Sequence, residues 1–474
     1  MILFSVLVIA AAGAGATLAL RHRPAPSAVV GLLALAAICA VAAFVPVGEA
    51  LNVGDAHLVA SPFARWFIVA AAGALFAIEL TGLLHGSLRQ LPLAALAGTG
   101  AVAAALTLTE PAAAMLAVTA AGLLGLIATL GRPVAMPSLR VTADGLRLGA
   151  VTGLLGLAGI ALVGLDGTHL PAQTIGAGIL AVGAATAVRL GAVPLHIPTA
   201  RLVATARLAA VPLVAAWLPA AFAAVGLAWI ETTAATTGAA TPTAHLALAV
   251  VGAATIALAG VVALLDDDLA RLIGYGLIAD GGFVVLAAAS ADPAVFPAAR
   301  IWLISMGLSR TVMVGAIVGL EGAFGTRRVR ELGGWLRRMP MTGAALIAAA
   351  LVGVGLPTML PFEARRTLAV LALGEGVGVA ALALGALPIL GLVRLFWVGL
   401  RPPSAAVAEA DAELPLRRPD GGLAGRARLI AAWQLNGTAI ASAATLLLGL
   451  LALGAAVGIG DLGGAASAAG SVLP

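Results

Sequence analysis

Six ionisable side chains interrupt stretches of the sequence that are otherwise strongly apolar. They are Arg189, His196, Asp280, Arg310, Glu363 and Arg365. A charged group inside a membrane span is costly, so such residues usually pair with one another or border an ion or proton path. Carboxylates and imidazole rings can take up and release a proton, whereas arginine keeps its charge. Together these residues predict a path on which protons move by charge coupling, with water between the side chains.

Each of these residues also has a structural interpretation. Asp280 and Arg310 lie near the middle of neighbouring apolar runs, so we expect an ion pair between them, either within a path or as a bridge between helices. His196 is expected either to handle protons or to act as a satisfied structural histidine. Glu363 and Arg365 are expected to cap or line the helix break that they follow.

Two matching proline pairs lie close to these side chains. Pro194 and Pro198 interrupt one over-long apolar run, and Pro357 and Pro361 interrupt another, in both cases as Pro-x-x-x-Pro. A proline inside a membrane helix frees a backbone carbonyl that only protein or water can satisfy. Matching interruptions in the two halves of a membrane protein are typical of ion or substrate paths near the bilayer midplane. The sequence therefore predicts a transporter or an ion-translocating subunit.

The composition is that of a membrane protein. Of 474 residues, 62% are hydrophobic and 10% are charged, with a mean hydropathy of +1.11, whereas about 25% of a soluble protein is charged. The single cysteine and the scattered histidines lack the spacing of a metal, haem or iron–sulfur site, and no dinucleotide motif is present. We therefore expect no metal, no cofactor and no redox chemistry in this chain itself. All 26 basic residues are arginine, but without a soluble basic domain they do not indicate a nucleic-acid partner.

Runs of about 20 apolar residues predict an all-α polytopic membrane protein with about fourteen transmembrane helices. Arginines gather in the odd-numbered loops and acids in the even-numbered ones, with only Arg65 and Arg300 on the acidic side. By the positive-inside rule, both termini lie outside the cytoplasm. A miscounted helix would disturb this alternation, so its regularity favours fourteen spans. We expect a multi-pass protein of the cytoplasmic (inner) cell membrane, embedded in the lipid bilayer.

Four short motifs follow one another between residues 185 and 400. They read RLGAVPLH at 189–196, DLARLIGYGLIADGGF at 268–283, LGGWLRRMP at 332–340 and GLPTMLPFEAR at 355–365. The set resembles the antiporter-like membrane subunits of respiratory complex I (subunits L, M and N), Mrp cation/proton antiporters and membrane-bound hydrogenases. The corresponding family patterns are K-x-x-x-x-P-[FL]-H, D-L-K-R-L-[IL]-A-Y-S-S-I-x-H-x-G-[FY], L-G-G-L-x-x-x-M-P and G-[IF]-P-P-x-x-G-F-x-x-K.

The resemblance implies fourteen helices with two inverted five-helix repeats, in which helices seven and twelve are discontinuous. It also implies proton translocation, with sodium as an alternative ion, and other membrane subunits as partners. The expected division of the chain is an N-terminal group of four helices at 1–109, a first half-repeat at 110–245 broken at 191–198, a second half-repeat at 246–400 broken at 353–361, a cytoplasmic linker at 401–429 and a C-terminal helix at 430–474.

Several positions depart from the family's pattern. Arg189, Arg310 and Arg365 stand where helices seven, eleven and twelve usually carry lysine, and Asp280 stands where helix ten usually carries histidine. The usual glutamate of helix five is missing from the run at 111–130. Because arginine does not release its proton, a relay that needs a neutral lysine would fail at three sites.

These observations favour a proton-translocating subunit of a redox-driven complex of the NADH:quinone oxidoreductase or hydrogenase type. The departures keep two alternatives open. One is a diverged scaffold subunit that has the fold but no longer pumps. The other is the membrane subunit of an Mrp-type antiporter or of an inorganic-carbon uptake system, although no pair of carboxylates suggests a sodium site.

Overall fold

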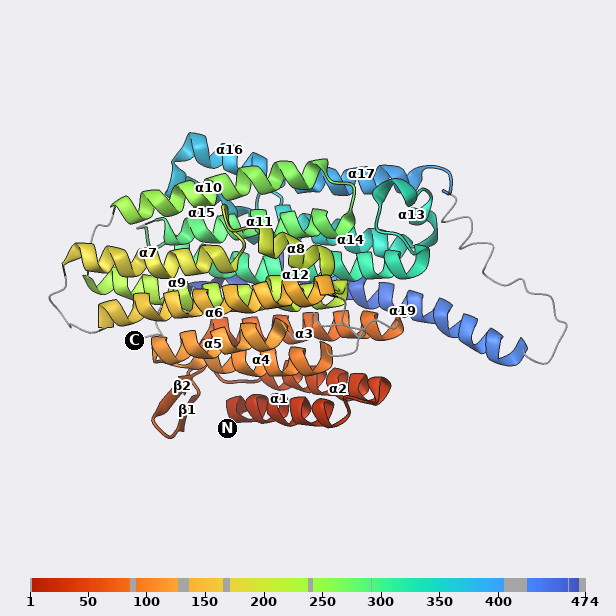
Figure 1. Ribbon diagram of the computed structural model, residues 1–474, viewed down its shortest axis with the longest axis horizontal. Helices are drawn as coiled ribbons and strands as arrows, with labels where there is room; N and C mark the ends of the chain where they lie inside the picture. The colour runs from red at the N-terminus through yellow and green to blue at the C-terminus, as the bar shows by residue number, and fades with distance from the viewer. Residues whose placement is uncertain are drawn as a thin grey trace.

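The computed structural model describes residues 2–85, 91–126, 136–164, 171–237, 242–290, 292–404, 424–458 and 460–468. Within them the chain forms a bundle of roughly parallel helices with one β-hairpin at its edge (Figure 1). The α-helices are α1 (Ile2–Ala19), α2 (Pro24–Ala43), α3 (Pro62–Leu84), α4 (Leu91–Thr107), α5 (Pro111–Gly125), α6 (Met136–Gly164), α7 (Ala172–Arg189), α8 (Ile197–Thr205), α9 (Leu218–Thr237), α10 (Pro242–Leu265), α11 (Leu269–Ala288), α12 (Val295–Phe324), α13 (Trp335–Arg338), α14 (Pro340–Val354), α15 (Leu360–Leu373), α16 (Glu375–Ala386), α17 (Pro388–Leu400), α19 (Ala424–Ala456) and α20 (Leu462–Ala468). Short 3-10 segments η3 (Leu208–Ala210) and η5 (Val329–Glu331) and the π-helix η4 (Pro212–Trp217) complete the helical structure of these residues.

The helices have the length and composition of membrane spans. Ten helical segments of the described residues are long and apolar enough to cross a bilayer, and α4, α5 and α14 are shorter apolar helices. A crossing needs about 20 apolar residues when the helix is continuous and untilted. The chain is therefore a helical multi-pass membrane protein, and the expectation of about fourteen crossings stays a prediction.

One element departs from the all-helical expectation. Strands β1 (Ala50–Val53) and β2 (Ala56–Val59) form an antiparallel hairpin between α2 and α3, in which Val53 pairs with Ala56. The two residues between them, Gly54 and Asp55, form the turn, and Gly54 has a φ of +60°. Glycine adopts this backbone region without strain, which is why a Gly-Asp pair is a strong hairpin signal.

Helices α11 and α12 form the buried centre of the bundle. Nearly all of their residues are buried, whereas only about a third of α2 or of the α16–α17 segment is. Figure 1 shows α12 running through the middle of the bundle, with α1 and α2 along one edge and α16 along the other. A polar side chain in the buried middle of α11 or α12 is therefore held away from lipid and must find a partner within the protein.

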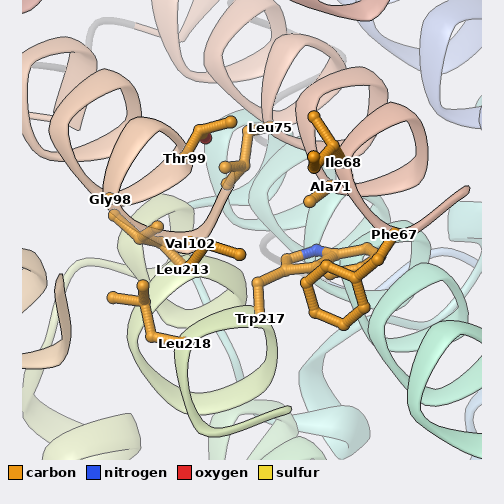
Figure 2. Close-up of a pocket in the computed structure, with 10 residues that line it drawn as sticks. All are labelled: Phe67, Ile68, Ala71, Leu75, Gly98, Thr99, Val102, Leu213, Trp217 and Leu218. Atoms are coloured by element: carbon orange, nitrogen blue, oxygen red, sulfur yellow. The ribbon is translucent and has the colours of Figure 1, made fainter. Parts of the chain in front are cut away.

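The N-terminal helices join this centre through aromatic packing. The Phe67 ring of α3 meets the Trp217 ring of η4 edge to face at 5.3 Å, and the Trp217 indole donates a hydrogen bond of 3.0 Å to Thr311 of α12. Figure 2 shows the small pocket between α3, α4 and η4 that these rings border. Its lining is apolar except for Thr99 and the Trp217 indole nitrogen, so it is a packing defect at a seam and offers no ion path.

The first interrupted helix ends at a glycine. Gly191 has a φ of +76°, and its N–H bonds the Val188 carbonyl while the N–H of Ala192 bonds the Ala187 carbonyl. This pair of bonds is a Schellman motif, which satisfies the Ala187 and Val188 carbonyls of α7 within the chain itself. Helix α7 has therefore already ended when the chain reaches Pro194, and this proline does not interrupt a continuous helix.

The second interrupted helix ends differently. Helix α14 stops at Gly355, whose φ is +75° and where a Cβ atom would lie 2.7 Å from the Phe362 backbone nitrogen. Pro357 lies in the following non-helical stretch, as Pro194 does after α7. Pro198 and Pro361 instead lie in the first turns of α8 and α15. Proline is well suited to a first helical turn, where its missing N–H removes no helical bond, so the second proline of each pair begins a helix and does not break one.

The two ends of the bundle differ in their loops. The Leu3 N–H bonds Glu49 beside the hairpin, and Arg300 of α12 bonds the Ala466 carbonyl of α20, so both ends of the described chain lie on the hairpin side. On the opposite side, the segment at 266–268 pairs with the segment at 327–329 and binds Arg330 and Arg394. Asp268 begins α11 there by accepting the N–H groups of its first turn.

Candidate functional site

The centre of the bundle holds a buried ion pair between α11 and α12. The Arg310 Nε donates to Asp280 Oδ2 at 2.6 Å, and both side chains are almost fully buried. Arg310 also donates to the Gly276 carbonyl at 3.1 Å and contacts the Met313 sulfur at 3.3 Å. The Asp280–Arg310 pair expected from the sequence is therefore present, and every nitrogen of the guanidinium has a partner.

Arg365 lies between the second helix break and this pair. Its Nη1 donates to the Gly353 and Val354 carbonyls at 3.3 and 3.1 Å, at the end of α14 where the helix dipole is negative. The guanidinium also lies over the Phe283 ring, with its Cζ 4.4 Å from the ring centroid, and 5.1 Å from that of Trp302. At this break the Arg365 side chain bonds carbonyls near the end of the helix. At the first break, the backbone N–H groups of Gly191 and its neighbours do so.

The aromatic rings connect Arg365 with the ion pair. Trp302 stands edge to face on Phe283, and its indole nitrogen donates to the Asp280 carbonyl at 3.1 Å. A cavity of about 10 Å³ is lined by Arg310 and by Gly353 and Val354 of the break, which is close to the least space that holds one water. Two permanent cations therefore lie at the end of α14, and one of them, Arg310, is paired with the buried Asp280 carboxylate.

His196 lies on the other side of α11. It occupies the N-cap of α8, is half-buried, and its ring centroid is 6.3 Å from that of Tyr275. Its Nδ1 is buried without a hydrogen-bond partner among the described residues. Because Tyr275 directly precedes Gly276, whose carbonyl binds Arg310, the histidine is joined to the ion pair through one turn of α11.

Replacing His196 by glutamine tests whether this imidazole handles protons. Glutamine keeps hydrogen-bonding groups but cannot take up a proton, so proton movement is expected to slow by about tenfold or more while assembly is retained. The measurement is the initial rate of proton movement in proteoliposomes at equal subunit incorporation. His57→Gln, in the exposed hairpin, is the control, and an unchanged rate in His196→Gln would dismiss the role.

Arg189 and Glu363 lie apart from this cluster. Arg189, the last residue of α7, borders a separate cavity of about 50 Å³ and has its Cζ 5.7 Å from the Phe222 ring centroid. Glu363 is half-exposed and pairs with Arg366 at 3.7 Å on the outer face of α15. Of the six predicted residues, the structure thus brings together Asp280, Arg310 and Arg365, with His196 nearby.

The sequence pattern described as "NADH:quinone oxidoreductase/Mrp antiporter, TM" matches residues 142–388 of this chain, just over half of its length. The chain belongs to this family. All six predicted residues fall inside the matched region, as do both interrupted helices. The antiporter family match thus covers the cluster around Arg310 and leaves helices α1 to α5 outside it.

Individual members of the antiporter family are similar over shorter stretches. NADH-quinone oxidoreductase subunit N 2 of Syntrophobacter fumaroxidans is 29% identical over 129 residues, which is 27% of this chain and 27% of that protein. In the first curated relatives, the matched stretch covers between 24% and 27% of their length. These local matches agree with the family assignment.

Solved structures of antiporter-family complexes share the whole fold. A chain of respiratory complex I from Thermus thermophilus superposes with a TM-score of 0.71 at 20% identity, covering 96% of this chain and 99% of that one. A chain of the Mrp complex from Dietzia sp. gives a TM-score of 0.64 at 19% identity, covering 100% and 98%. Both structures contain multi-subunit membrane complexes, and the likeness extends to helices α1 to α5, which the family pattern does not match.

Two further acidic groups of this antiporter-family chain lie outside the six predicted residues. Glu79 of α3 is fully buried beside Gly31 and Pro92, and neither carboxyl oxygen has a partner among the described residues. Glu231 of α9 forms an ion pair with Arg300 near the hairpin side of α12. The signal for Glu79 was a single acid within an apolar run. The sequence signal for the Glu231–Arg300 pair was that the two residues carry opposite charges at the same predicted end of two spans.

Proposed function

We propose that this chain is a proton-translocating, antiporter-like membrane subunit of a redox-driven complex of the NADH:quinone oxidoreductase or hydrogenase type. The observation that carries the proposal is the buried Asp280–Arg310 pair, with Arg365 held against it at the second helix break. A buried ion pair flanked by a further cation is expensive inside a membrane. Such an arrangement is typical of sites where a change of charge is transmitted.

The chemistry of the side chains limits how protons move. Arginine keeps its charge, so Arg310 and Arg365 act on the path through their fields and do not carry the proton. Asp280 and His196 are the groups near the cluster that can bind one. Protonation of Asp280 would leave Arg310 without a counter-charge, and this couples proton arrival at the pair to movement or charge change in the neighbouring break.

The finer architecture is part of the same proposal. The α7–α8 and α14–α15 segments correspond to discontinuous helices seven and twelve of a fourteen-helix protein with two inverted five-helix repeats. The hairpin side, where both ends of the described chain lie, faces away from the cytoplasm. The arginine-rich loops on the opposite side support this orientation, and the shared side of the two ends agrees with an even number of crossings. Other membrane subunits are the expected partners.

Proton movement in proteoliposomes that hold the purified assembly tests the function directly. Asp280→Asn and Arg189→Ala are compared with the wild type at equal subunit incorporation. Because each change removes a charge from a proposed path while leaving most packing intact, pumping is expected to fall by about tenfold or more in both. Unchanged pumping in both variants, with the complex intact, would leave a scaffold subunit built on a transporter fold.

A non-pumping scaffold is the second candidate, favoured by one specific observation. Helix α5 contains no acid, and Arg189 has no carboxylate within ion-pair distance among the described residues. The first half of the bundle therefore lacks the ion pair that the second half has. An Mrp-type or inorganic-carbon uptake subunit is a further alternative, supported by the shared fold of the Mrp complex chain.

A further inference from the structure

We propose that the cavity beside Arg189 binds a small monovalent anion of about halide size. The cavity of about 50 Å³ lies between α5, α6, α8 and η4, and Arg189 is the charged residue of its lining. That volume exceeds the space needed for one water several-fold, so it admits a small anion together with water. The inference concerns binding alone and does not depend on whether the subunit pumps protons.

Arg189 lacks a counter-charge in the part of the chain that the structure describes. Its neighbour across the gap is the Phe222 ring, and no carboxylate comes within 4.0 Å of its guanidinium. Because arginine cannot shed its proton, it stays charged at this depth. An uncompensated charge within a membrane protein is costly, so the site favours any anion that can reach it.

The walls of the cavity are built to admit the guanidinium. A Cβ atom at Gly122 of α5 would overlap its Nη2, and one at Gly149 of α6 would overlap its Nη1. The side chain therefore occupies a slot between two helix backbones that only glycine leaves open.

Arg189 is not needed to complete the backbone of its own helix. The N–H groups of Leu190, Gly191 and Ala192 bond three carbonyls of its last turn, and the Arg189 side chain takes no part in these bonds. Arg365, in contrast, uses its guanidinium to bond the two carbonyls at the end of α14. The hydrogen-bond donors of Arg189 are thus available to a ligand, whereas Arg365 has committed one of its nitrogens.

Helix α8 adds to the positive potential of the cavity. Pro198 and Thr199, from its first turn, form part of the lining. Proline has no N–H, so the donor that this first turn offers at the cavity is the backbone N–H of Thr199, which lies at the positive end of the helix dipole. With the Arg189 guanidinium on one side and the start of α8 on the other, the cavity offers anion contacts from two directions.

Thermal stability in different anions tests the proposal. A ligand that binds only the folded state raises Tm in a saturable way, so chloride or bromide in place of bulky gluconate is expected to raise Tm of the purified assembly by about 1–3 °C. Ionic strength and pH are held constant. No saturable shift in the wild type would overturn the proposal and leave a guanidinium surrounded by water only.

Two variants separate the site from general salt effects. Arg189→Gln is expected to abolish the chloride-dependent shift, and Arg147→Gln, which removes an exposed arginine of α6, is expected to keep it. A shift that persists in Arg189→Gln would place the anion elsewhere and overturn the proposal. If that variant does not assemble, wild-type crystals soaked in bromide decide: an anomalous peak within hydrogen-bond distance of Arg189 is expected, and its absence would contradict the inference.

Discussion

Replacing Asp280 by asparagine, or Arg310 by glutamine, is expected to lower the free energy of unfolding by about 3–5 kcal/mol, because each change leaves one buried charge without its partner. The double replacement removes both charges and is expected to cost less than the sum of the single ones. A double-mutant cycle on the detergent-solubilised subunit, followed by denaturant or heat, measures this coupling. Strictly additive costs would show that the two groups do not depend on one another.

The pair between Arg327 and Glu321 is a matched control for this cycle. Its Nε–Oε1 distance is 2.7 Å, close to that of the buried pair, but its side chains are 28% and 35% exposed. Exposed pairs typically contribute about 0.2–1 kcal/mol, so Glu321→Gln is expected to have a small effect. The contrast between two ion pairs of similar geometry isolates the contribution of burial.

Replacing Arg365 by leucine is expected to be the second most damaging change. It removes hydrogen bonds to two carbonyls at the end of α14, each worth about 1.5–3 kcal/mol when the donor is charged, and the stacking on Phe283 and Trp302. Lysine at this position is expected to rescue only part of the loss, because it cannot reproduce the planar fork. Thermal unfolding and resistance of the 355–359 stretch to proteolysis are the measurements.

The neighbouring residue provides the control for Arg365. Arg366 is half-exposed, and among the described residues its ion pair is with Glu363, so Arg366→Leu is expected to change stability by less than about 0.5 kcal/mol. Equal effects at the two positions would mean that the carbonyls of the break are satisfied without Arg365, and the account of how α14 ends would have to be abandoned.

The sequence predicted the central ion pair for a simple physical reason. Asp280 and Arg310 carry opposite charges near the middle of successive spans, and a charge at that depth must be compensated. The two interrupted helices were also visible, because prolines marked them. The sequence did not show how each helix ends. Gly191 ends α7 through its backbone conformation, and Arg365 bonds carbonyls of α14 that lie near it only in the folded chain.

The position of Glu363 shows that closeness in sequence does not predict a shared position in the fold. Glu363 and Arg365 were grouped because both follow Pro361, yet successive residues of a helix are about 100° apart around its axis. Residues two apart therefore point to nearly opposite faces of the helix. Glu363 lies on the outer face with Arg366, and Arg365 points inward to the Phe283 ring. The cavity at Arg189, in turn, depends on glycines from two separate helices and has no signal in any single stretch of sequence.

The contact between Gly281 and Leu190 joins α11 directly to the first helix break. A Cβ atom at Gly281 would lie 2.9 Å from the Leu190 Cβ and 3.0 Å from the Leu190 carbonyl oxygen, so the backbone of α11 packs closely against the first helix break. Close-packed interiors transmit small displacements because they have little room to absorb them. Since Asp280 is the adjacent residue, this contact places the first helix break one residue away from the buried ion pair with Arg310. The two halves of the bundle thus meet at this contact, beside the Asp280–Arg310 pair.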